Sequence, residues 1–189
     1  MLAKQTLVLE RLRELLRQQG GLLATLVGEA EGSANAEGSA NSEAPAESPA
    51  RLAASGPRTE RQGEQYELLV EAIYEGYLLH YGTPRVVRAA DADLRVLAGD
   101  RLYAIGLARL VELGDTQAVA ELADTITLSA LAQGAGDERL ADAVWAAGAR
   151  AVGWGPSEQH AHAKRLVGAG ATDAFEAMRT SAAEIARTP

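Results

Sequence analysis

The sequence predicts an all-α protein, and three observations favour this fold class. Hydrophobic residues make up 47% of the 189 residues, whereas aromatic residues make up only 4%. This composition suits helices that pack through leucine, valine and alanine better than a β-sandwich, which is rich in β-branched and aromatic residues. Apolar residues recur at helical spacing over most of the chain, and no segment shows the alternation of a strand or an Asn-Gly hairpin turn. We therefore expect a helical bundle around one core.

Residues 1–27 are predicted to form an amphipathic helix. The leucines at positions 2, 9, 12 and 16 recur at helical spacing, and most charged residues lie between them. The glycine pair Gly20-Gly21 is expected to end this helix. Docking on the protein's own core or on a partner chain is the favoured role, and a membrane-surface helix is the alternative.

Residues 28–61 are predicted to be a disordered acidic linker. The segment contains a six-residue repeat, at 30–35 and 36–41, and continues with serine, alanine, glutamate and proline. Such a stretch cannot bury enough apolar surface to offset the entropy lost on ordering. The linker is expected to tether the N-terminal helix, which makes that helix a candidate docking element for another chain. Trypsin is expected to cut the linker at Arg51 or Arg58.

The remaining residues, 62–188, are predicted to form the main α-helical bundle domain. Glycine, proline and aspartate mark the expected ends of its helices. The expected helices are a first ending near Tyr81, a second over about 92–113, a third capped by Asp115, a fourth capped by Asp137, a fifth with Pro156 in its first turn, and a last over about 172–186.

Charge and composition exclude several classes of function. The formal net charge is −8, from 26 acidic and 18 basic residues, so the field of the protein repels nucleic acid and anionic membranes. The absence of cysteine excludes disulfides, thiolate metal sites and thiol catalysis. No apolar run approaches the roughly 20 residues that span a bilayer, and the N-terminus lacks the apolar region of a secretory signal. We therefore expect a cytoplasmic protein without a transmembrane segment.

Two neighbouring segments carry a family resemblance. The first is Tyr81-Gly-Thr-Pro-Arg-Val-Val-Arg88, in a predicted loop, and the second is Val96-Leu-Ala-Gly-Asp100-Arg-Leu, on the helix that follows. The pair resembles the middle of class I polyprenyl diphosphate synthases, over about residues 64–136. This resemblance implies part of the isoprenoid synthase fold. It also implies a homo-oligomer, or a hetero-oligomer with a synthase subunit, because members commonly dimerise and some include a smaller non-catalytic chain.

The residues that carry the family's chemistry are missing from this chain. Family members hold magnesium with two aspartate-rich motifs, the first of the form Asp-Asp-x-x-Asp on the helix before the loop. The corresponding helix here carries Glu71 and Glu75, and the sequence contains no Asp-Asp pair. Asp91 and Asp93 would point about 200° apart on a helix. We expect no catalytic residue, metal or cofactor; Glu75, Asp91 and Asp93 are metal-ligand candidates only in a divergent magnesium-dependent enzyme.

Other polar and apolar residues supply candidates for binding. Arg85, Arg88 and Arg95 are candidates for binding a diphosphate or a partner, with a solvated helix start and local ion pairs as the alternative. Leu102 and Ile105, on the leucine-rich helix after the loop, are candidates for an interface. His160 and His162 are expected to be surface histidines, because they diverge on a helix.

The expected function is that of a non-catalytic protein similar to polyprenyl synthases, working as an accessory or regulatory subunit in isoprenoid diphosphate metabolism. One alternative is a divergent magnesium-dependent enzyme acting on prenyl diphosphates. The other is a helical scaffold or adaptor without a link to isoprenoids, since a fold does not determine a function.

Overall fold

The computed structural model describes residues 2–28 and 48–185, and these residues form an all-α structure, as predicted. Their only β-structure is an isolated antiparallel bridge between Val27 and Val87. No helix in the described ranges is both long and apolar enough to cross a membrane. The elements are α1 (Leu2–Gln19), α2 (Gly21–Thr25), α3 (Pro49–Ala54), a 3₁₀ turn (Glu60–Gln62), α4 (Gly63–Tyr81), α5 (Ala92–Glu112), α6 (Thr116–Gly134), α7 (Glu138–Trp154), α8 (Glu158–Gly168) and α9 (Ala174–Ile185).

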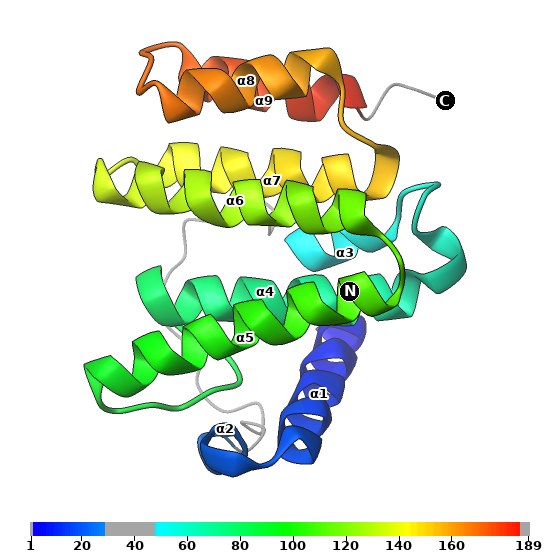
Figure 1. The fold of residues 1–189 in the computed structure, drawn as a ribbon, viewed down its shortest axis with the longest axis vertical. Helices are drawn as coiled ribbons and strands as arrows, with labels where there is room; N and C mark the ends of the chain where they lie inside the picture. The colour runs from blue at the N-terminus through cyan, green and yellow to red at the C-terminus, as the bar shows by residue number, and fades with distance from the viewer. Residues whose placement is uncertain (1, 29–47, 186–189) are drawn as a thin grey trace.

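The helices from α4 onward are arranged as stacked antiparallel pairs (Figure 1). The α4–α5 pair, the α6–α7 pair and the α8–α9 pair form three successive layers, and α7 contacts both α6 and α9. α3 lies between α4 and α7, while α1 crosses the outer side of the α4–α5 pair. The N-terminal helix and the short α3 are therefore parts of the same packed body as the predicted bundle.

The apolar face of α1 is covered by the chain's own core. Leu12 and Leu16 are fully buried against residues of α4 and α5. The same cluster contains Leu102 and Ile105, which are 0% and 6% exposed. The prediction that these two residues form an interface is wrong, because α1 already occupies the surface that they would offer. The N-terminal helix was also a candidate for docking on another chain. In this structure its apolar face packs on α4 and α5 of the same chain.

Part of the predicted linker is ordered. Residues 29–47 lie outside the described residues, but residues 48–61 contain α3 and the start of the 3₁₀ turn. Ala50, Leu52 and Ala53 are buried in the main core beside α4 and α7. The prediction of disorder is therefore wrong for residues 48–61. Small alanine side chains carry little hydrophobic signal in sequence, yet they allow a short helix to approach its neighbours closely.

Side-chain caps set the first residues of α6, α7 and α8. The Asp115 side chain accepts a hydrogen bond from the amide of Ala118, and the Asp137 side chain accepts one from Leu140, so both predicted N-caps are confirmed. The fifth predicted helix begins later than expected. Its N-cap is Ser157, whose hydroxyl accepts from the amide of His160, so Pro156 precedes the helix instead of lying in its first turn.

Glycines allow α4 and α5 to approach each other closely. A Cβ atom added to Gly76 would lie 2.9 Å from the carbonyl oxygen of Gly99, and one added to Gly99 would lie 2.5 Å from Nε2 of His80. Both separations are shorter than a van der Waals contact. The Leu-Ala-Gly-Asp segment of α5 thus has a packing role, and its Asp100 carboxylate lies 3.2 Å from His80 Nε2.

Candidate functional site

A cluster of buried charged residues lies where the α4–α5 loop meets α4. Glu71 and Glu75 are four residues apart on α4, so they share one helix face, and both are fully buried. Arg85 extends from the loop between them. Its guanidinium forms an ion pair with Glu71, and its Nε lies 3.5 Å from Oε2 of Glu75. We call these three residues the Glu–Arg–Glu cluster.

Main-chain amides of the loop bind the second oxygen of Glu75. Its Oε1 accepts hydrogen bonds from the backbone amides of Arg85, Val86 and Val87, at 2.8, 2.6 and 3.1 Å. Three amide donors on one oxygen fix the orientation of the Glu75 side chain. The interaction also fixes the path of the chain as it leaves α4. Glu75 therefore anchors the loop, and its Oε1 is already engaged.

α1 holds the other side of the same loop. The buried guanidinium of Arg13 donates to the carbonyl of Arg85 at 3.2 Å and to the carbonyl of Gly28 at 3.2 Å. The amide of Gly28 in turn donates to the carbonyl of Val86 at 2.8 Å. The loop is thus clamped between α4 and the N-terminal helix, which gives α1 a positioning role that its leucine pattern did not reveal.

The pKa of Glu71 lies above that of an ordinary surface glutamate. Burial raises the pKa of Glu71, the positive charge of Arg85 opposes this increase, and the negative charge of Glu75 adds to it. The Ser48 hydroxyl donates to Oε2 of Glu71 at 3.4 Å, which is a long hydrogen bond. Two carboxylates that share a single arginine are expected to compete for its positive charge.

A cavity of about 390 Å³ lies beside the cluster, between α4, α7 and the start of α3. Its wall includes Ser48, Tyr74, Arg85, Asp142 and Trp145. The Arg85 guanidinium lies over the Tyr74 ring at 5.2 Å, and the Trp145 ring meets Tyr74 edge-on at 4.9 Å. Burial, followed by the negative charge of Glu138, raises the pKa of Asp142. The cavity therefore combines aromatic walls with groups of both charges.

The other two predicted arginines do not join Arg85 in a common anion site. Arg95 donates from its guanidinium to the carbonyls of Leu79 and Gly82, at 3.2 and 3.0 Å. It thereby satisfies backbone acceptors at the end of α4. The exposed Arg88 side chain passes close to Gly28. Of the three arginines, only Arg85 reaches the buried glutamates.

The predicted aspartates serve α5 itself. Oδ1 of Asp91 accepts from the amides of Asp93 and Leu94, at 2.9 and 3.0 Å, and Asp91 is therefore the N-cap of the helix. Asp93 lies in the first turn, where a negative charge suits the helix dipole. Neither aspartate joins Glu75: among the described residues, no group of three or more histidine, cysteine, aspartate or glutamate side chains is placed to hold a metal ion.

A second buried polar cluster links α6 to the last two helices. His160, which was expected at the surface, is 2% exposed, whereas His162 is exposed as predicted. Nε2 of His160 lies 3.2 Å from Oε2 of Glu121, and Nδ1 of His160 lies 3.4 Å from the Ser181 hydroxyl. Lys164 donates to both oxygens of Glu121. Because the Ser181 and Glu121 side chains are also buried, this arrangement connects helices and is closed to a substrate.

Sequence reasoning named Arg85, Glu71 and Glu75 but not their relationship. It treated the arginine as a ligand-binding residue and the glutamates as a substitute for a metal motif, whereas in the structure these groups bind one another. Arg85 is 14 residues from Glu71 and 10 residues from Glu75, and these separations do not determine whether the loop turns back toward the glutamates. The roles of Ser48, Tyr74 and Asp142 had no recognisable sequence signal.

Comparisons of the chain with protein-family models, curated proteins and solved structures found no match.

Proposed function

We propose that this chain is a non-catalytic helical protein that acts as an accessory or regulatory subunit in isoprenoid diphosphate metabolism. The proposal joins two lines of support. The position of Arg85 in the candidate site argues for a non-catalytic role. The resemblance of the α4–loop–α5 region to class I polyprenyl diphosphate synthases supports the metabolic assignment.

The decisive observation is that Arg85 occupies the position beside the carboxylates where a metal-dependent enzyme would need a cation. Its positive charge is directed at Glu71 and Glu75, while Oε1 of Glu75 accepts three amide hydrogen bonds. Magnesium demands near-octahedral oxygen coordination and retains several waters. A fully buried carboxylate pair already bound to a guanidinium suits structure better than magnesium-dependent catalysis, which disfavours the divergent-enzyme alternative.

A role through association has support at the surface of α5 and α6. Val111 on α5 and Leu131 on α6 are 55% and 51% exposed, although both are large apolar residues. These residues replace Leu102 and Ile105 as candidates for contact with a second copy or with a synthase subunit.

The first experiment measures magnesium binding and prenyl transfer. Magnesium should leave the thermal midpoint of the protein unchanged, because a ligand stabilises a protein only by binding its native state. No allylic diphosphate should release diphosphate. Magnesium-dependent turnover that disappears in Glu75→Ala or Asp91→Ala would establish the divergent enzyme instead.

The second experiment measures assembly with a co-expressed polyprenyl synthase subunit by light scattering. We expect a complex that Val111→Glu or Leu131→Glu weakens, with Thr127→Glu, a charge change at another exposed position of α6, as the control. A monomer both with and without the synthase would remove the accessory role and leave the scaffold without an isoprenoid link.

A further inference from the structure

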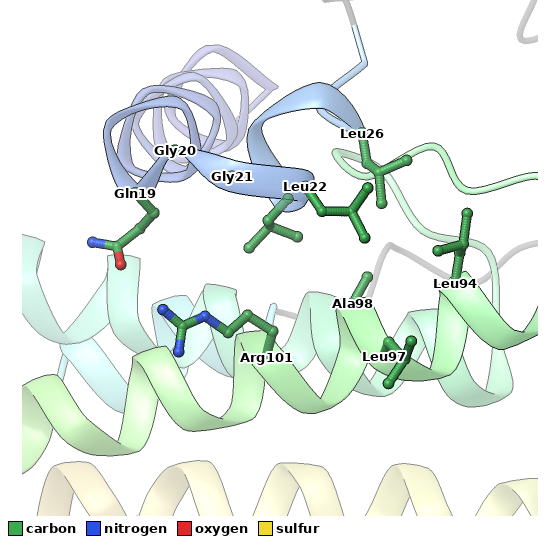
Figure 2. A pocket seen from close by; sticks show the side chains of 10 residues that line it. Gln19, Gly20, Gly21, Leu22, Leu26, Leu94, Leu97, Ala98 and Arg101 are labelled. Carbon is green, nitrogen blue, oxygen red and sulfur yellow. The ribbon is translucent and has the colours of Figure 1, made fainter.

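A second cavity lies on the opposite side of α5 from the α6–α7 layer, beneath the elbow that joins α1 to α2. It is a groove of about 300 Å³ between α2 and the first half of α5. In Figure 2, Leu22 of α2 and Leu26, which directly follows α2, extend toward α5, where Leu94 and Ala98 face them. Leu22 and Leu97 are 57% and 60% exposed, so the groove leaves large apolar side chains in contact with water.

The two ends of this groove differ in chemistry. Leucines line one end, while Gln19 and Arg101 lie at the other (Figure 2). Within the described ranges, neither the Arg101 guanidinium nor the Gln19 carboxamide forms a hydrogen bond or ion pair, in a protein whose net charge is −8. Arg101 is exposed and so free to meet a ligand, whereas Arg13 and Arg95 are held by carbonyls or carboxylates. The groove is thus apolar at one end and has two hydrogen-bond donors, the side chains of Arg101 and Gln19, at the other.

The backbone of the elbow holds α2 over α5. Gly20 and Gly21 have φ angles of 67° and 65°, in the left-handed region that glycine adopts readily. A Cβ atom at either position would meet nothing within 4 Å, so backbone conformation and not space favours glycine there. The turn places Leu22 on the groove rim and Leu23 in the buried core beneath it.

We propose that this groove binds the alkyl chain of a fatty acid, with its carboxylate on Arg101 and Gln19. An arginine fork donates two parallel hydrogen bonds to a carboxylate, and the amide of Gln19 supplies a further donor. The volume lies at the lower limit of ligand pockets, about 300 to 1,000 Å³. It therefore suits a single chain better than the several side-chain anchors of a docked helix. This proposal is independent of the function assigned to the Glu–Arg–Glu cluster.

Calorimetric titration of the full chain with decanoate tests the proposal, with decanol as the neutral probe of the same chain length. Decanoate should bind the unmodified protein and should bind Arg101→Gln at least about tenfold more weakly, because the charge-assisted pair is lost. Decanol should bind both proteins equally. The control Arg165→Gln removes the same charge from an exposed position on α8 and should leave decanoate binding unchanged.

A second test of the proposal replaces a leucine of the groove's apolar wall. Leu97→Gln should weaken both probes, whereas Leu7→Gln, at an equally exposed leucine on α1 outside the groove, should weaken neither. Both sites are exposed, and circular dichroism verifies that each variant is folded. The proposal is overturned if decanoate does not bind the unmodified protein or if Arg101→Gln and Leu97→Gln leave its affinity unchanged. Tighter binding of decyl phosphate than of decanoate would overturn the carboxylate assignment.

Discussion

Arg85 binds Glu75 through both its backbone and its side chain: its amide donates to Oε1 at 2.8 Å, and its guanidinium Nε lies 3.5 Å from Oε2. The two contacts come from one residue of the loop and meet a single buried carboxylate on α4. Charge pairing and loop conformation therefore depend on each other. Loss of the carboxylate charge should disturb both at once.

Glu75→Gln should lower the free energy of unfolding by about 2 kcal/mol, because the three loop amides lose a carboxylate acceptor and Arg85 loses one of its two carboxylate partners. Glutamine retains one carbonyl oxygen for the three amides but places an NH₂ donor toward the arginine. Urea denaturation monitored by circular dichroism gives the difference.

Glu64→Gln is the matched control for this change. Glu64 lies on the same helix and pairs with Arg11 at 3.0 Å, but its side chain is 83% exposed. Removal of an exposed pair should cost less than about 1 kcal/mol. Equal losses for the two variants would mean that the Glu–Arg–Glu cluster contributes no more than a surface pair.

Glu121 should make the stability of the protein depend on pH in the acid range. Burial acts to raise the pKa of Glu121, but hydrogen bonds from His160 and Lys164 outweigh it, and the pKa lies below its usual value of 4.5. A depressed pKa in the folded state adds stability above pH 4.5 that is lost as pH falls through the lower folded value.

Glu121→Gln should reduce this loss, so the free energy of unfolding of the variant should change less between pH 5 and pH 3. Glu176→Gln, which removes a carboxylate paired with Arg179 on the exposed side of α9, should preserve the loss. A variant with the original pH dependence would show that Glu121 is not the group that titrates.

Local chemistry explains why several helices could be predicted. Asp115 and Asp137 cap α6 and α7 through hydrogen bonds to residues only three positions away, which a sequence pattern contains. By contrast, His160 was expected at the surface but is buried against Glu121 and Ser181, which are 39 and 21 residues away in the sequence. Contacts over such separations are decided by packing and leave no local periodicity.

The order of α3 was also missed by the sequence prediction. Its residues lie in the stretch rich in serine, alanine, glutamate and proline that follows the repeat, so composition predicted disorder. In the structure, the amide of Leu52 donates to the carbonyl of Ser48, and the Thr59 hydroxyl donates to the carbonyl of Ala53 at 2.6 Å. Arg58 donates to the carbonyl of Val152 at 2.6 Å and pairs with Asp115. Alanine, arginine and leucine favour a helix locally, but six residues are too few to form a stable helix alone, so these partners fix the segment.

The amides of α3 should therefore be protected from hydrogen exchange in the native protein. Arg58→Ala should reduce this protection more than it reduces protection in α9, since the arginine ties the turn after α3 to α7 and α6. Exchange measured by mass spectrometry on peptides covering residues 48–62 provides the test. Unprotected amides in the unmodified protein would restore the prediction of disorder for this segment.

The last prediction concerns the close approach of α4 and α5. In an open helix, replacing glycine with alanine stabilises by up to about 1 kcal/mol, because glycine has low helix propensity. Gly76→Ala should have the opposite effect, since the new Cβ would lie 2.9 Å from the Gly99 carbonyl oxygen, a backbone atom that cannot rotate away. The expected loss is about 1 to 3 kcal/mol, as for other overpacked sites. Gly134→Ala is the control, because a Cβ at this helical position on α6 meets nothing within 4 Å and should be neutral or stabilising. Denaturant titration of both variants decides the sign, and stabilisation by Gly76→Ala would show that the two helices separate at no cost.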